Sequence, residues 1–342
     1  MKKILLLIFL IPVFAYSQFP KDIINQNCYD SGWPDNTKDF LVTEDAMYFL
    51  ADQTTDDGNQ NYDHNIVLVK TDLEGKQYWI KTYGGSLPDF PASIIEDNEG
   101  FIYIGGSTYS TDGDIQSGNM GGEDVWIIKL DTSGIILWER TYGGAKNDYS
   151  GKLLSLENGN ILLYTASFSS DYDVQMNYGF LDLWLSELTP NGDIINSKSY
   201  GSSNHDNLFS LIQTSDGGFF TAARAGANDG AVNGEPRGGN DVWLLKLDIS
   251  LNIEWQKLIG GSFSDGGGYG LAELSDGGYI FNGKTRSSDK DVHGFDFPDV
   301  SDQDDNWVVR LDSEGNIVWD IALGGDRFES SSEVFANDDG TF

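Results

Sequence analysis

Short apolar runs alternate with polar turns along the chain. In one stretch the runs are "SIIED" at 93–97, "FIYIGGST" at 101–108, "DVWIIKLD" at 124–131 and "IILWERTYG" at 135–143. Runs of this length, rich in β-branched and aromatic residues, are typical of β-strands. Tight turns such as "EDNEG" and "DTSG" join the first run to the second and the third to the fourth, which predicts antiparallel hairpins.

The four-strand pattern repeats along the chain. The glycine pairs that follow the fourth run begin at Gly84, Gly143, Gly201, Gly260 and Gly324, with spacings of 59, 58, 59 and 64 residues. A repeat of this size is one supersecondary unit that buries its faces against its neighbours. We therefore predict an all-β fold, a β-propeller built of four-stranded antiparallel blades, with five complete repeats and a truncated sixth.

The register also predicts the organisation of the chain. Residues 1–17 have the pattern of a secretory signal peptide, because Lys2 and Lys3 precede a short apolar run. Residues 18–38 form an N-terminal lead-in to the propeller repeat domain at 39–342. Its units are expected at 39–85, 86–144, 145–202, 203–261 and 262–325, with a partial unit at 326–342. We expect further C-terminal sequence to complete the ring and to carry any sorting or catalytic domain.

Eight of the nine tryptophans follow the repeat. Four lie in the third strand (Trp126, Trp184, Trp243, Trp307) and four in the fourth (Trp79, Trp138, Trp255, Trp319). Aromatic side chains at a repeated position bury large areas, so we predict that they pack between blades. Ligand stacking is the alternative.

Asp131, Gly134 and Trp138 have a spacing that two other units share. This spacing resembles the tryptophan-docking motif of quinoprotein-type propellers, which implies that the tryptophan caps the neighbouring blade. The whole unit is similar to tandem repeats of large secreted proteins of Bacteroidota, often placed ahead of a type IX secretion sorting domain. Three positions depart from the pattern, and we expect a weaker blade interface near the second of them: Thr189, Asn196 and Leu251.

The chain is strongly acidic, with a formal net charge of −33. Such a surface repels nucleic acid and anionic lipid, so we expect no nucleic-acid partner. Cations, basic proteins and neutral glycans are the favoured ligands, although the acids could serve solubility alone. After the signal peptide no apolar run approaches the roughly 20 residues of a membrane span. Cys28 is the only cysteine, so no intrachain disulfide is possible. We expect a secreted or outer-surface protein.

Loops after the second and fourth strands share one face of each blade, and binding tends to reside in such loops. An acid recurs at a fixed distance after the glycine pair. In a turn it is expected to cap backbone N–H groups; the alternative is a ring of carboxylates at the channel mouth. These acids are Asp89, Asp148, Asp206 and Asp265, with Glu329 in the last unit.

The loop after the second strand carries alternating acids. Carboxylates with nearby glycine suit calcium, which takes 6 to 8 oxygen ligands, but no full EF-hand loop is present. The densest case is "SSDKDVHGFDFPDVSDQDD" at 287–305. The candidate calcium ligands are therefore Asp289, Asp291, Asp296 and Asp299, and more weakly Asp112, Asp114, Asp171 and Asp173; a solvated acidic loop is the alternative.

The sequence contains no pattern for nucleophilic or zinc chemistry. The histidines His64, His205 and His293 fall at unrelated positions of their units, and no G-x-S-x-G motif occurs. Glycoside hydrolysis needs only two carboxyl groups, so a carbohydrate-active hydrolase using Asp or Glu on the long-loop face is the alternative function. An anionic quinone cofactor fits an acidic face poorly. We predict a noncatalytic module that binds a glycan or an extracellular protein.

Overall fold

The computed structural model describes residues 36–56, 62–149, 151–293, 304–324 and 334–337, and these contain strands but no helix. No helix capable of crossing a membrane therefore occurs among them. The strands are β1 Asn36–Val42, β2 Met47–Asp56, β3 Tyr62–Thr71, β4 Gln77–Tyr83, β5 Asp89–Glu96, β6 Ile102–Thr108, β7 Asp124–Leu130, β8 Ile136–Tyr142, β9 Lys152–Ser155, β10 Ile161–Ser167, β11 Asp182–Leu188, β12 Ile194–Tyr200, β13 Ile212–Gln213, β14 Phe219–Ala225, β15 Asp241–Leu247, β16 Ile253–Ile259, β17 Asp265–Glu273, β18 Tyr279–Thr285, β19 Asp305–Leu311 and β20 Ile317–Leu323.

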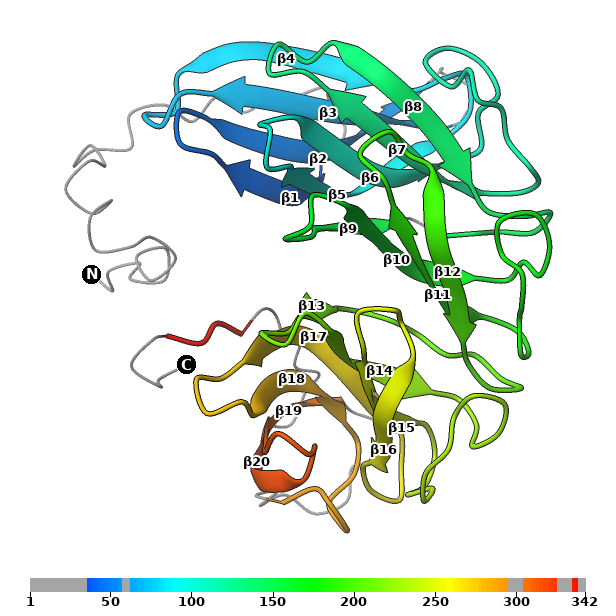
Figure 1. The fold of residues 1–342 in the computed structure, drawn as a ribbon, viewed down its shortest axis with the longest axis vertical. Coiled ribbons are helices and arrows are strands. Elements are labelled where there is room, and N and C mark those ends of the chain that lie inside the picture. The colour runs from blue at the N-terminus through cyan, green and yellow to red at the C-terminus, as the bar shows by residue number, and fades with distance from the viewer. Residues whose placement is uncertain (1–35, 57–61, 150, 294–303, 325–333, 338–342) are drawn as a thin grey trace.

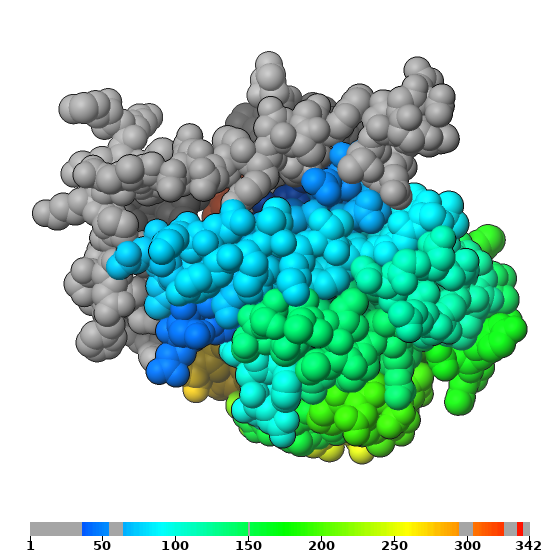
Figure 2. All heavy atoms as spheres, turned by 90° about the horizontal axis from the view of Figure 1, so that it is seen from above, coloured from blue at the N-terminus to red at the C-terminus, as the bar shows by residue number. Residues whose placement is uncertain are grey.

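Each consecutive set of four strands forms one antiparallel sheet in chain order. The five sheets follow one another around an arc, from β1–β4 to β17–β20 (Figure 1). Figure 2 shows the first three of them, coloured blue to green, packed directly against one another. The chain therefore has the predicted all-β propeller architecture. The first described strand, β1, begins at Asn36, and the unit boundaries expected from the repeat stay a prediction.

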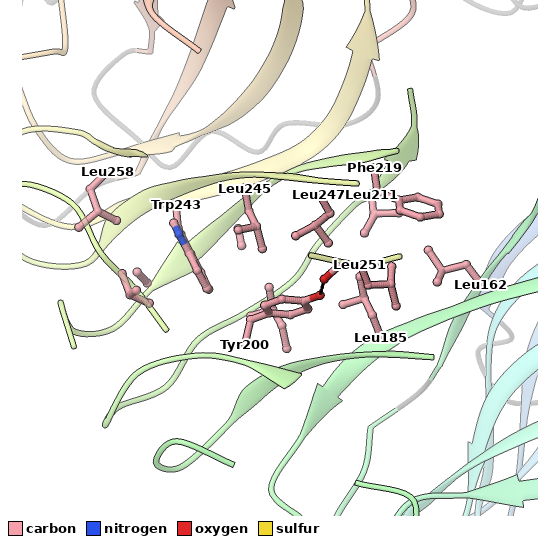
Figure 3. Close-up of a cluster of buried hydrophobic side chains, with 14 of the residues drawn as sticks. Leu162, Leu185, Tyr200, Leu211, Phe219, Trp243, Leu245, Leu247, Leu251 and Leu258 are labelled. Carbon is pink, nitrogen blue, oxygen red and sulfur yellow. Dashed lines mark hydrogen bonds between the residues drawn. The ribbon is translucent and has the colours of Figure 1, made fainter. Parts of the chain in front are cut away.

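The hydrophobic core lies between the blades. Each of four buried clusters draws residues from two consecutive sheets. The cluster between the third and fourth blades is shown in Figure 3, where Leu162 and Leu185 of one sheet face Phe219 and Leu245 of the next. Because every blade buries a face only against its neighbours, stability depends on blade-to-blade packing, as it does in other repeat proteins.

The third-strand tryptophans are fully buried, and each has a partner for its indole N–H. Trp126 Nε1 donates to Glu139 Oε2 at 2.9 Å and Trp184 Nε1 donates to Ser197 Oγ at 2.8 Å. Trp243 and Trp307 donate in the same way to Gln256 and Asp320. The acceptor is always a polar residue of the adjacent fourth strand, so the buried donor is never left without a hydrogen bond.

Three of the fourth-strand tryptophans, Trp79, Trp138 and Trp255, contact the next blade. A Cβ added to Gly134 would lie 3.0 Å from the Cη2 atom of Trp79, and one on Gly192 would lie 3.2 Å from that of Trp138. Trp138 Nε1 also donates to the carbonyl of Pro190 at 3.1 Å. These glycines have φ of 75° and 82°, and they turn the last hairpin of the following blade. Only glycine takes this left-handed conformation without strain while leaving room for an indole ring.

The joint between the third and fourth blades is built differently. Asn196 replaces the tryptophan, and Leu251 replaces the glycine with φ of 62°. The Leu251 side chain is fully buried in the cluster of Figure 3, beside Tyr200. Asn196 Nδ2 donates to the carbonyl of Ser250 at 2.9 Å. Leucine thus fills space that an indole ring fills elsewhere; the expected weakness of this interface stays a prediction.

Thr189, the remaining departure from the repeat, accepts the backbone hydrogen bonds that the turn aspartate accepts in other blades. In the second blade Asp131 Oδ1 accepts the N–H groups of Ser133 and Ile135, both at 2.9 Å. Thr189 Oγ1 accepts the corresponding N–H groups of Asn191 and Asp193, at 3.3 and 3.1 Å. A hydroxyl supports the turn with longer hydrogen bonds.

Candidate functional site

The loops after the second and fourth strands of each blade meet on one side of the propeller. They are joined by backbone hydrogen bonds, such as Asp114 N–H to the Gly84 carbonyl at 3.0 Å and Asp173 N–H to the Gly143 carbonyl at 3.1 Å. We call this side the long-loop face, formed by 84–88, 109–123, 143–149, 168–181, 201–211, 226–240, 260–264 and 286–293.

The alternating acids of these loops hold the glycine pair that precedes their own blade. The first acid accepts the N–H of the residue after the pair: Asp112 from Ser86 at 2.7 Å, and Asp171 from Ala145 at 2.8 Å. The second acid accepts the N–H of the first glycine, at 3.1 Å for Asp114 and 3.3 Å for Asp173. These carboxylates therefore fasten consecutive blades together.

The fifth blade repeats this arrangement. Asp289 accepts from Ser262 N at 2.7 Å and Asp291 from Gly260 N at 3.2 Å, and Asp291 also forms an ion pair with Arg237 at 2.8 Å. The hydroxyl of Ser262 holds the pKa of Asp289 below its usual range. Asp296 and Asp299 lie outside the described residues. Within the described ranges no three His, Cys, Asp or Glu side chains are grouped as metal ligands. Calcium binding stays a prediction.

Four of the acids after the glycine pairs are buried and hydrogen-bonded, and the fifth, Glu329, lies outside the described residues. Asp148 Oδ2 accepts from Gly144 N at 2.7 Å and from Ser169 Oγ at 2.9 Å, while Oδ1 accepts from Ser167. Asp89, Asp206 and Asp265 accept equivalent backbone N–H groups from Gly85, Ser202 and Gly261. All four are at most 1% exposed, so they present no ring of carboxylates to solvent.

A second row of buried aspartates faces these acids, and the sequence analysis did not single it out. It consists of the residue that begins the third strand, as in Asp124, Asp182 and Asp241. A Cβ on Gly143 would collide with carboxylate oxygens of both Asp124 and Asp148, which places the two carboxyl groups on either side of this glycine. In the described part of the chain, Oδ1 of each of the three is buried without a hydrogen-bond partner.

Burial is the main cause that raises the pKa of these carboxyls. The pKa of Asp124 rises to about 7, with Asp148 adding to the shift, and that of Asp182 rises to about 6. A neutral carboxyl is less costly to bury than a carboxylate. The signal for this row was visible, since an aspartate two residues before the third-strand tryptophan recurs in the repeat.

Four aromatic rings contact one another on the long-loop face around the third blade. Tyr149 and Phe168 meet edge to face with centroids 5.8 Å apart, and Phe168 meets His205 edge to face at 5.8 Å. His205 stacks on Phe180, with centroids 5.2 Å apart and an interplanar angle of 16°. Tyr149 is 39% exposed, Phe180 is 58% exposed, and His205 is exposed. We call these four residues the aromatic platform.

A polar hollow of about 500 Å³ lies among the first strands of the blades. The carboxylates among its described lining residues are Asp39 and Glu273. Asp39 accepts from Ile94 N at 2.9 Å, and burial raises its pKa. Glu273 accepts from Ser215 N at 2.6 Å. Lys38 and Lys152 line the same hollow, so its charged groups are of both signs.

Comparison with protein families supports the repeat. The SBBP family, described as a β-propeller repeat, matches residues 79–114. These residues run from the fourth strand of the first blade to the loop after the second strand of the next. This match agrees with the propeller of repeated four-stranded sheets that the structure describes. No curated protein matches it.

Solved structures give a distant likeness only. An apocarotenoid oxygenase from Synechocystis is 12% identical with a TM-score of 0.45, over 84% of this chain and 60% of the oxygenase. A protein of unknown function from Dyadobacter fermentans is 14% identical with a TM-score of 0.41, over 82% and 79% of the two chains. A thermostable family-43 glycoside hydrolase is 10% identical with a TM-score of 0.43, over 86% and 95%. Likeness at this level carries no information about activity.

Proposed function

We propose that the protein is an exported, noncatalytic β-propeller that binds a glycan or an extracellular protein on its long-loop face. The observation that carries the proposal is the aromatic platform, because large rings such as Phe180 are held exposed on loops of a rigid scaffold. Exposed apolar groups gathered on one surface mark interaction sites. Loops fixed to a repetitive scaffold are the usual place for them.

The acids of the long-loop face are more consistent with a binding protein than with a catalyst. Asp112 and Asp171 are hydrogen-bonded to backbone N–H groups, and Asp148 is buried. Acids that hold the scaffold in successive blades serve its architecture, whereas a catalytic pair is needed only once. The net charge of −33 favours neutral or basic ligands over anionic ones.

Two screens test the proposal. The purified full chain is applied to a glycan array, and separately to candidate extracellular proteins followed by titration of each purified partner. Saturable binding of a glycan or a protein is expected. The absence of binding in both screens contradicts the proposal.

A carbohydrate-active hydrolase is the second candidate; its acids are expected from the sequence on the long-loop face, whereas the carboxyl that favours it is Asp39 of β1, in the polar hollow. A carboxyl with a raised pKa is the kind of group that acts as general acid. The test is release of reducing sugar from a panel of polysaccharides, comparing the protein with its Asp39→Asn variant. Hydrolysis that the substitution abolishes supports this candidate, and an untouched panel removes it.

A further inference from the structure

We infer that the aromatic platform binds the sugar rings of a neutral polysaccharide; this inference rests on the proposed binding function and names its site and ligand class. The platform is assembled from three loops. Tyr149 follows β8, Phe168 and Phe180 lie between β10 and β11, and His205 follows β12. Because these loops belong to consecutive blades, the ring-to-ring contacts run across two blade joints.

Two of the four platform residues, Phe180 and His205, depart from the repeat, whereas Tyr149 and Phe168 have aromatic equivalents in the second blade, Phe90 and Tyr109. The residue two positions before the third strand is Phe180 in the third blade but Gly122 and Gly239 in the second and fourth. The residue before the buried acid is His205 at this joint but Asn147 and Ser264 at others. Packing between blades is achieved without aromatic rings at these positions. The blade architecture therefore does not require the rings of Phe180 and His205.

The loop backbone that carries Phe180 and His205 is held in place by side-chain amides. Asn177 Nδ2 donates to the carbonyl of Phe180 at 3.1 Å and to that of Ser167 at 3.2 Å. Asn204 Oδ1 accepts the His205 N–H at 2.9 Å, and Asn204 Nδ2 donates to the Gly226 carbonyl at 3.2 Å. A loop whose backbone is already ordered loses little conformational freedom on binding, which favours affinity.

The chemistry of the platform fits sugar rings. A pyranose offers an apolar C–H face for an aromatic ring and hydroxyl groups at its edge. The Tyr149 hydroxyl and the His205 ring nitrogens supply polar groups beside the apolar faces, the usual composition of a ligand site. Several rings in a row suit a chain of sugars better than a single one. The acidic surface selects against polyanionic polysaccharides.

Binding is tested by affinity electrophoresis and calorimetry of the full chain. The neutral probes are soluble xylan, mixed-linkage β-glucan and galactomannan, and the anionic probes are alginate and polygalacturonate. We expect at least one neutral probe to bind and the anionic probes not to bind. Binding of anionic probes alone overturns the inference.

Variants locate the site. Phe180→Ala and His205→Ala are expected to weaken binding of the neutral probe at least tenfold, and His205→Phe to retain most of it because an aromatic ring remains. The matched control is Tyr78→Ala, an aromatic residue 57% exposed on β4 in the first blade, which should leave binding unchanged. Melting temperatures of all variants check that the fold is intact.

The outcomes separate this inference from the proposed function. Glycan binding that Phe180→Ala and His205→Ala leave intact overturns the platform while the binding function stands. Binding of a purified protein partner without any polysaccharide overturns the ligand class only. The absence of every ligand in these assays and in both screens contradicts inference and function together.

Discussion

At the joint between the third and fourth blades, Asn196 stands where other blades have tryptophan. Leu251 of the next blade fills the space that the indole ring fills at those other joints. At the preceding joint Trp138 packs over Gly192, and at the following one Trp255 packs over Gly315. In Figure 3, Leu251 points into the cluster between the two sheets. Asn196 is smaller than the usual tryptophan, and Leu251 is larger than the usual glycine. The two changes compensate each other in volume, which preserves the packing.

This relationship predicts a coupling between the two positions. Leu251→Gly should lower the free energy of unfolding by about 2–4 kcal/mol, because the lost burial outweighs the relief of strain at φ of 62°. The double variant Asn196→Trp with Leu251→Gly recreates the usual joint and should recover most of the loss. Urea denaturation of the single and double variants measures it. A double variant no more stable than Leu251→Gly contradicts the explanation.

The indole hydrogen bond of Trp184 predicts unequal effects for two neighbouring serines. Ser197→Ala removes the acceptor of a buried N–H and should cost about 1–3 kcal/mol of unfolding free energy. Ser186 only donates to Ser197, at 3.0 Å, so Ser186→Ala should cost less. Thermal and urea denaturation compare the two. Equal losses would show that the acceptor of the indole has no special role.

The buried aspartates predict that stability falls as pH rises through 6 to 7. Burial raises the pKa of Asp124 to about 7 and that of Asp265 to about 6, above the ordinary value near 4. A raised native pKa contributes stability that is complete below about pH 4 and is lost as pH rises through the native pKa. The melting temperature should therefore decline between pH 5 and pH 8.

Asp124→Asn should reduce this decline and raise the melting temperature at pH 8, because the amide is neutral at every pH. The first blade has Asn65 at the equivalent position, so the repeat tolerates the substitution. The matched control is Asp131→Asn on a hairpin turn, where hydrogen bonding from Ile135 lowers the pKa. That control should leave the slope of melting temperature against pH unchanged between pH 5 and pH 8, because the Asp131 carboxyl titrates below about pH 4. If melting temperature falls with pH equally steeply in Asp124→Asn and in the wild type, the raised pKa of Asp124 is not the cause of the decline.

Calcium binding to the fifth-blade loop remains a prediction that calorimetry can check. If calcium binds there, the ion should raise the melting temperature, chelator should reverse the rise, and Asp289→Ala should abolish binding. Asp171→Ala in the third blade is the control, because that loop is the weaker candidate. No heat of binding and no shift with chelator would leave these acids as backbone caps alone.

The blade architecture could be predicted from sequence because its determinants are local. Asp131 and Gly134 define a hairpin within four residues, and the strands on either side have the expected composition. The role of Asp112 could not be predicted in this way. It caps Ser86, a residue 26 positions away that belongs to the previous loop, so its hydrogen bond exists only once two blades are packed.

The aromatic platform could not be predicted from the sequence for the same reason. Tyr149, Phe168, Phe180 and His205 share no spacing that a motif could capture, and three loops must meet before their rings touch. The buried row that includes Asp124 carried a visible signal in its recurrence. Its meaning required the position of Asp148 across Gly143, which belongs to the following loop.

Hydrogen–deuterium exchange with and without the tightest ligand from the screens tests the central claim most directly. The account predicts slower exchange on ligand binding in 145–149, 168–181 and 203–207 of the long-loop face. The hairpin turns on the opposite face, such as 131–135 and 248–252, should be unaffected. Protection confined to those hairpin turns, with none on the long-loop face, would contradict the account.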